Sequence, residues 1–202
     1  MKKLVAHIFL SFTSLCAATA NEYEPRIYDE ANIVEAELRC PSPDGKWELV
    51  YKGRRHTVQT ELSTADEIVL VSCEGHEISL TGLCLSGQTL YKRNIIKQPW
   101  SPDGKWLAIP NGNTGYKFCR TDALNTSAFS SNMLLSITIM DKDGRHIYRV
   151  QDAHWDENGT FLFSAGLSGW IAPYRAELTD GSVSYKQIGK MEAPYNSAGM
   201  NR

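Results

Sequence analysis

The hexapeptide Ser-Pro-Asp-Gly-Lys-Trp stands at residues 42–47 and returns unchanged at residues 101–106. A looser copy, Asp-Glu-Asn-Gly-Thr-Phe, follows Trp155 at residues 156–161. An identical string of this length within 202 residues indicates internal duplication of a structural unit. The string suits a tight turn, because Pro presets φ, Asp bonds nearby backbone amides and Gly takes the positive φ that reverses the chain. The aromatic residue that follows is expected to begin the next strand, facing the core.

The segments between these turns have the patterns of β-strands. Residues 34–40 alternate apolar with charged side chains, the period of a half-buried strand, and residues 68–73 form an apolar run of high β-propensity. Further strands are expected at residues 134–140, 146–150, 161–164, 170–178 and 183–188. An Asp-Lys-Asp-Gly sequence at 141–144 predicts a hairpin turn. Helical periodicity is absent, so the sequence predicts an all-β fold of repeated antiparallel sheets.

Residues 100–109, Trp-Ser-Pro-Asp-Gly-Lys-Trp-Leu-Ala-Ile, resemble the repeat of TolB-like β-propellers, which are relatives of the WD-repeat group. In that family the Ser-Pro-Asp-Gly turn joins the first two strands of a blade, and a second hairpin completes the four strands. The resemblance covers residues 40–188 and implies a propeller-like arrangement of three recognisable blades.

The repeat leaves the closure of a propeller ring open. Its copies begin at residues 42, 101 and 156, further apart than the ~40 to 50 residues of a usual blade. Three blades are also fewer than the ~4 that normally close a ring. Either residues 21–39 supply a fourth blade, or the sheets stack without closing.

The first twenty residues have the pattern of a secretory signal peptide. Two lysines follow the initiator Met, residues 4–15 are largely apolar, and Ala18-Thr19-Ala20 supplies a small-x-small cleavage site. The apolar stretch is shorter than the ~20 residues that span a bilayer. We therefore expect cleavage after Ala20, a periplasmic or secreted location, and no membrane insertion after cleavage.

The mature chain is expected to form a single domain over residues 21–195, followed by a flexible tail at 196–202. Loss of the two signal-peptide lysines takes the formal charge from −2 to −4. The longest basic cluster, Lys-Gly-Arg-Arg at residues 52–55, is too small to neutralise a run of phosphates. Nucleic acid is therefore excluded as a partner.

Four cysteines remain after cleavage, and an even number in an oxidising compartment favours two disulfides. The candidates are Cys40, Cys73, Cys84 and Cys119. The favoured pairing joins Cys73 to Cys84, which closes the shortest loop, and leaves Cys40 with Cys119. Four buried free thiols are the alternative. The spacing contains no Cys-x-x-Cys, so zinc and thioredoxin-like chemistry lack their signature.

Catalytic and metal-binding motifs are incomplete throughout the chain. Ser168 misses the Gly-x-Ser-x-Gly spacing of a nucleophile elbow. His76-Glu77 begins like a zinc protease motif, but Leu80 stands where the second histidine is needed. The turn at 141–144 begins like a calcium loop and lacks its later acidic ligand. We therefore expect no enzyme activity, no cofactor and no metal.

Residues that do not repeat are the better candidates for function, because the repeated aromatics are explained by core packing. The segment 111–131 is poor in aliphatic residues and predicts the longest loop, where function often lies. Trp, Tyr and Arg are the residue types that dominate binding interfaces. The candidate contacts with a partner are Tyr116, Phe118 and Arg120 in this segment, and Trp170, Tyr174 and Arg175 after a glycine pair.

These observations predict an exported, non-catalytic binding protein that presents loops to a protein partner in the cell envelope. An inhibitor, an immunity protein or a subunit of an envelope complex would fit. One alternative is a sensor of a small ligand or carbohydrate, with a pocket lined by Trp170 and Tyr174. The other is a propeller hydrolase, for which Asp152, Asp156 and Glu157 are the candidate acids.

Overall fold

The computed structural model describes residues 32–112, 114–124, 129–140, 144, 149–167 and 170–192 of the chain. The predicted signal peptide and tail, and the hairpin turn at 141–143, lie outside the described residues, as does Ser168. Within them the strands pair only antiparallel, so the prediction of an all-β fold with antiparallel sheets is confirmed.

The strands form three sheets in chain order. The first contains β1 (Ile33–Pro41), β2 (Trp47–His56), β3 (Thr64–Ser72), β4 (Glu77–Ser79) and β5 (Leu90–Tyr91). The second contains β6 (Trp106–Asn111), β7 (Gly115–Arg120) and β8 (Leu135–Thr138). The third contains β9 (Arg149–Trp155), β10 (Phe161–Leu167), β11 (Trp170–Leu178) and β12 (Val183–Gln187). Helical turns are short: α1 (Thr81–Cys84), η2 (Lys92–Asn94), η3 (Thr121–Ala123) and η4 (Ser131–Met133). The described strands close no ring.

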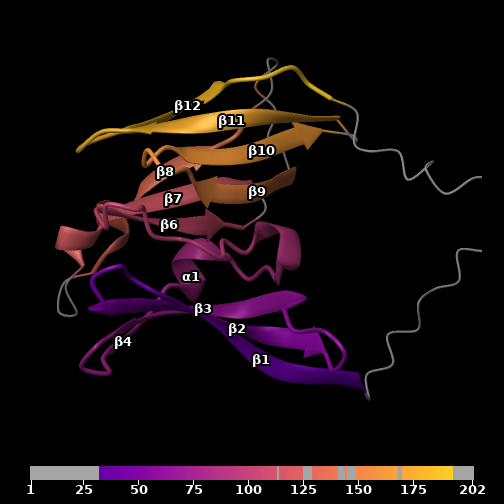
Figure 1. The fold of residues 1–202 in the computed structure, drawn as a ribbon, viewed down its shortest axis with the longest axis vertical. Coiled ribbons are helices and arrows are strands. Elements are labelled where there is room, and N and C mark those ends of the chain that lie inside the picture. Colours follow the sequence, from indigo (N-terminus) through magenta and orange to yellow (C-terminus); the bar gives the residue numbers. More distant parts are fainter. Residues whose placement is uncertain are drawn as a thin grey trace, which may run out of the picture.

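The sheets are stacked, with the second between the first and the third (Figure 1). Successive side chains of a strand point to opposite faces, and the second sheet buries both. From one face Leu107, Ile109 and Cys119 join the first core cluster, with residues of the first sheet and α1. From the other face Ala108 and Phe118 join the second core cluster, with residues of the third sheet. The stack is therefore held by two apolar layers.

The three predicted turns are confirmed at the start of β2, β6 and β10. In the first, the Ser42 hydroxyl donates to Asp44 over 2.7 Å, and the Asp44 carboxylate accepts the amide of Lys46. The second turn repeats these bonds with Ser101 and Asp103. Glycine is required at the fourth residue of each turn, where φ lies between +69° and +77°.

The third turn is one residue shorter, which corrects the equivalence of Phe161 with Trp47 and Trp106. The amide of Ser42 bonds the carbonyl of Trp47, whereas that of Asp156 bonds the carbonyl of Thr160. Thr160 therefore takes the tryptophan position, and Phe161 falls on the opposite face of its strand. Phe161 is fully buried against the second sheet, while the two tryptophans are half-buried at the turns.

The segment 111–131 is not the long loop that its composition predicts. It contains β7, whose Tyr116 and Phe118 rings pack in the second core cluster and whose Cys119 packs in the first, and the short helix η3. The composition was misleading because the polar residues flank the strand, whereas the aromatic residues inside it carry the packing.

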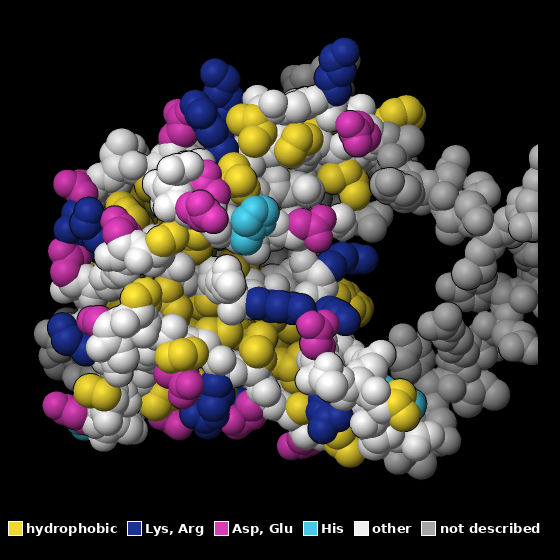
Figure 2. All heavy atoms as spheres, viewed as in Figure 1, with side chains coloured by type: hydrophobic (Ala, Val, Ile, Leu, Met, Phe, Trp, Pro, Cys, Tyr) yellow, Lys and Arg dark blue, Asp and Glu magenta, His cyan; other side chains and the backbone are white. Residues whose placement is uncertain are grey.

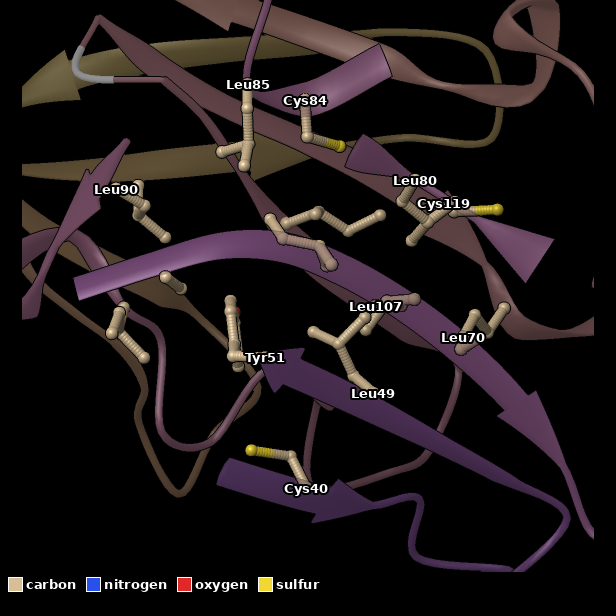
Figure 3. Packing of buried hydrophobic residues seen from close by; sticks show 14 of the residues in the cluster. Cys40, Leu49, Tyr51, Leu70, Leu80, Cys84, Leu85, Leu90, Leu107 and Cys119 are labelled. Carbon is tan, nitrogen blue, oxygen red and sulfur yellow. The ribbon is translucent and has the colours of Figure 1, made fainter. Parts of the chain in front are cut away.

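The structure pairs none of the four cysteines, so the predicted disulfides are not formed. Cys73 is exposed beyond the end of β3, whereas Cys84 is buried in α1 (Figure 3). Cys40 and Cys119 share the first core cluster, but their thiols bond the carbonyls of Lys97 and Arg120, which are different parts of the chain. Burial raises the pKa of the thiols of Cys40, Cys84 and Cys119 to about 12.

Candidate functional site

The three turns lie side by side at one end of the stack, which we call the turn end. Clefts lined by residues of both neighbouring turns separate the first turn from the second and the second from the third. A Cβ on Gly104 of the second turn would lie 3.9 Å from Pro43 of the first. Hydrogen bonds from Trp100 to Cys40 and from Trp155 to Pro99 hold the turns at this spacing.

The larger cleft of the turn end, the Trp106 cleft, has a volume of about 430 Å³ and lies between the second turn, the third turn and β11. Its wall includes Asp103, Trp106, Glu157, Arg175, Glu177 and Leu178. Trp106 is half-buried and stands at the base of the second turn. Arg175 pairs with Glu177 over 2.7 Å, whereas Glu157 has no cation partner among the described residues. The cleft thus combines an aromatic surface with a surplus of negative charge.

A third cleft at the turn end has a volume of about 330 Å³. It repeats the arrangement of the Trp106 cleft one sheet earlier in the stack. Trp47 stands at the base of the first turn, and the facing wall comes from Thr121 and Asp122 of η3. Because Trp47 and Trp106 occupy the same position in identical turns, the two clefts are products of the repeat. The third turn has Thr160 at this position in place of a tryptophan, and Thr160 itself lines the Trp106 cleft.

Carboxylates outnumber cations at the turn end. The acidic side chains are Asp44, Asp103, Asp122, Asp156, Glu157, Glu177 and Asp180, and the cations are Lys46, Lys105, Arg120 and Arg175, together with Arg39 and Lys97 of the cleft between the first and second turns. Hydrogen bonds from the Ser42 hydroxyl, and to a smaller extent from the Lys46 amide, lower the pKa of Asp44. The Ser101 hydroxyl and then the Lys105 amide lower the pKa of Asp103 in the same way. These carboxylates therefore stay charged well into the acid range.

Arg120 links the second sheet to the third at this end. Its guanidinium pairs with Asp122 over 2.6 Å and with Asp180 in the turn between β11 and β12. The same contact lowers the pKa of Asp122. Arg120 and Arg175 are therefore the two predicted partner-contact residues that the structure brings to the turn end.

The other predicted contact residues lie elsewhere. Tyr116 and Phe118 have no exposed surface, because they form the aromatic centre of the second core cluster. Tyr174 is 7% exposed and stacks on Phe163 with ring centroids 5.5 Å apart, so it makes no open pocket with Trp170. Trp170 is 52% exposed at the opposite end of β11 from Arg175.

Sequence reasoning missed Trp106, Glu157 and Glu177 as members of one cleft. From the repeat, Trp106 was expected to lie in the core. The same repeat could have indicated an accessible tryptophan, because a residue directly after a tight turn lies at a strand end, where burial is incomplete. Glu157 and Glu177 line the same cleft because the third turn lies against β11. The repeated sequence does not specify this packing.

The candidate acids of a hydrolase are not brought together. Asp156 accepts the amides of Asn158 and Thr160 and serves its own turn. Glu157 belongs to the Trp106 cleft, and Asp152 lines a different cleft beside β9. Within the described ranges the acidic, histidine and cysteine side chains form no group of three able to hold a metal ion.

The described part of the chain contains no helix with the length and apolarity needed to cross a bilayer. No protein-family model matches the chain, and the comparison with curated proteins gives no significant match.

Proposed function

We propose that this chain is an exported, non-catalytic binding protein whose turn end docks a protein partner in the cell envelope. The observation that carries the proposal is the pair of repeat-equivalent clefts, each with a half-buried tryptophan, set side by side in a rim rich in carboxylates. An inhibitor, an immunity protein or a subunit of an envelope complex would fit this proposal.

Three physical features support docking of a protein at this end. Tryptophan and arginine in partly closed pockets are the side chains that most often dominate binding energy. The turns are held by the buried indole bonds of Trp100 and Trp155, so little ordering accompanies binding. The surplus of carboxylates favours a partner with a basic surface, through faster encounter and correct orientation.

The proposal includes a propeller-like origin for the stack. The three sheets correspond to three blades of a TolB-like repeat arranged in an open series, each linked to the previous one by its tryptophan. Export rests on the signal-like pattern of residues 1–20.

The test is capture of a partner from an envelope extract of the source cells by the immobilised mature chain. Trp106→Ala should lower retention of the captured protein by about tenfold, as expected for a hot-spot residue. Trp170→Ala is the matched control, because it removes an exposed tryptophan at the other end of β11. Retention should also fall as salt is raised. Capture of no protein, or equal retention by both variants, would overturn the proposal.

A small-ligand or carbohydrate sensor remains a second candidate, and one observation favours it. The Trp106 cleft places an aromatic surface beside the carboxylates of Asp103 and Glu157, which is the mixed apolar and polar lining of a ligand pocket. A panel of sugars should then raise the melting temperature and change the tryptophan fluorescence of the protein. Trp106→Phe should abolish the fluorescence change, and an unresponsive panel would remove this candidate.

A further inference from the structure

The chain crosses from the first sheet to the second through residues 92–98, which we call the connector. Ile95 packs in the first core cluster and Ile96 in the second. The side-chain amide Nδ2 of Asn94 donates to the backbone carbonyl of Val150 over 2.5 Å, which attaches η2 to β9 of the third sheet. All three sheets therefore hold the connector in place, and its charged side chains have a fixed base.

A cleft of about 470 Å³ lies between the connector and β9. One wall carries the cations Lys92, Arg93 and Lys97, and the other carries Asp152 and His154. In Figure 2, Lys and Arg side chains cross the middle of the face at the level of the connector, between the first and third sheets. The cleft shares no lining residue with the Trp106 cleft.

The β9 wall is shaped by a local irregularity in the sheet. The pairing of β9 with β10 shifts register between Leu162 and Ser164, and Asp152 has a φ of +58°. Such bulges turn a side chain away from its regular direction. The Nδ1 atom of His154 lies 2.9 Å from the carbonyl oxygen of Asp152, so this carbonyl accepts the Nδ1 proton. In the neutral ring the other nitrogen, Nε2, is then an acceptor, which suits a hydroxyl of a ligand.

The charges of the cleft are only partly compensated. Lys92 and Lys97 share one carboxylate, that of Glu61, and Lys92 reaches it over 2.7 Å. Arg93 lies 5.6 Å from the centre of the Tyr91 ring and meets no carboxylate among the described residues. Asp152 is the opposing charge, and its carboxylate accepts a bond from the side chain of Gln151. The cleft therefore keeps an excess positive charge in a chain whose formal charge is −2.

We propose that the connector cleft binds a small ligand bearing an oxyanion, either a carboxylate or a phosphate. Arg93 presents paired N–H donors that match both oxyanions, and the side-chain amide of Gln98 offers a neutral donor on the same cleft. Ile95 and Ala153 supply apolar contact for the body of the ligand. This site shares no lining residue with the Trp106 cleft, although Lys97 and Gln98 also line the cleft between the first and second turns, and it does not depend on the docking function proposed for the turn end.

The test is calorimetric titration of the mature protein with two probes, inorganic phosphate and citrate. Arg93→Gln should weaken binding by about tenfold or more, because it removes a charged donor. Asp152→Asn should strengthen binding several-fold, because it removes the opposing charge. A gain of affinity cannot result from a damaged fold. Arg175→Gln is the matched control, since it removes an arginine from the Trp106 cleft. It should leave the binding of phosphate and citrate unchanged.

The two probes distinguish the source of the oxyanion. Tighter binding of phosphate assigns the site to a phosphorylated ligand, and tighter binding of citrate assigns it to a carboxylate. Binding that Arg93→Gln leaves unchanged, or that Asp152→Asn weakens, would overturn the proposal. Absence of heat and of amide chemical-shift changes with both probes would overturn it as well.

Discussion

The indole Nε1 of Trp155 donates a hydrogen bond to the carbonyl oxygen of Pro99 over 2.9 Å. Each residue stands just before one of the repeated turns, Trp155 in the third unit and Pro99 in the second. One unit earlier, the Trp100 indole makes the same bond to the carbonyl of Cys40 over 2.7 Å. Both tryptophans are buried, so these bonds are shielded from water and fix the spacing of the turns.

Trp155→Phe should lower the free energy of unfolding by about 1 to 2 kcal/mol, because it removes this bond and part of a buried ring. The carbonyl of Pro99 keeps its bond from the amide of Ala108, which limits the loss. Urea denaturation gives the comparison, with an unchanged m-value expected. Trp106→Phe is the control and should cost about 0.5 kcal/mol or less. Equal losses from both variants would contradict the special role of Trp155.

Asp156→Ala should destabilise the third turn by about 1 to 2 kcal/mol, because two backbone amides lose their acceptor. The Asp156 carboxylate accepts the amides of Asn158 over 3.0 Å and Thr160 over 2.7 Å. Glu157→Ala, one residue later, should stay within about 0.5 kcal/mol of the parent protein. Thermal denaturation of both variants checks the difference. Asp156→Ser should recover part of the loss, since serine fills this position in the other two turns.

In the folded protein with reduced cysteines, Cys73 should be alkylated quickly and the three core thiols only on unfolding. Cys73 is exposed, whereas Cys40, Cys84 and Cys119 are buried with pKa values raised to about 12. Mass spectrometry of peptides after timed iodoacetamide treatment reads the rates. Fast labelling of any core thiol at neutral pH would contradict the packing of the first core cluster.

Because of the same three thiols, we expect the free energy of unfolding to fall in alkali. In the unfolded chain they lose their protons near the ordinary value of 9, whereas in the folded protein they keep them to about 12. The stability that they contribute is therefore complete below pH 9 and falls as the pH rises toward 12. Cys84→Ala should make this alkaline slope shallower in urea titrations at stepped pH, and an unchanged slope would count against burial as the cause.

Because of Glu61, we expect the free energy of unfolding to fall in acid. Hydrogen bonds from Lys92 and then Lys97 lower the pKa of its carboxyl from 4.5 to about 2. The folded state therefore gains from the ionised carboxylate above pH 4.5, and the gain is lost as the pH falls toward 2. Glu61→Gln should flatten the dependence of unfolding on pH in this window.

Much of the local structure could be predicted from the sequence because it is set by short-range chemistry. The turns at residues 42–47 and 101–106 contain every atom of their own hydrogen-bond pattern, so their conformation follows from six residues. The alternation in β1 likewise depends only on which face each side chain occupies. The Trp106 cleft could not be predicted, because Glu157 and Glu177 approach Trp106 only when the second and third sheets pack.

By itself, the sequence determined the all-β class, the repeat and its turns, since each depends on backbone conformations within a few residues. Only the tertiary structure decided which side chains are accessible to a partner or ligand. It buried Tyr116 and Phe118 between two sheets, and it left the cysteines unpaired in separate surroundings. It also turned Phe161 to the opposite face through a turn one residue shorter. The physical reason is that burial and charge pairing arise from contacts between residues far apart in the chain, which a local pattern does not specify.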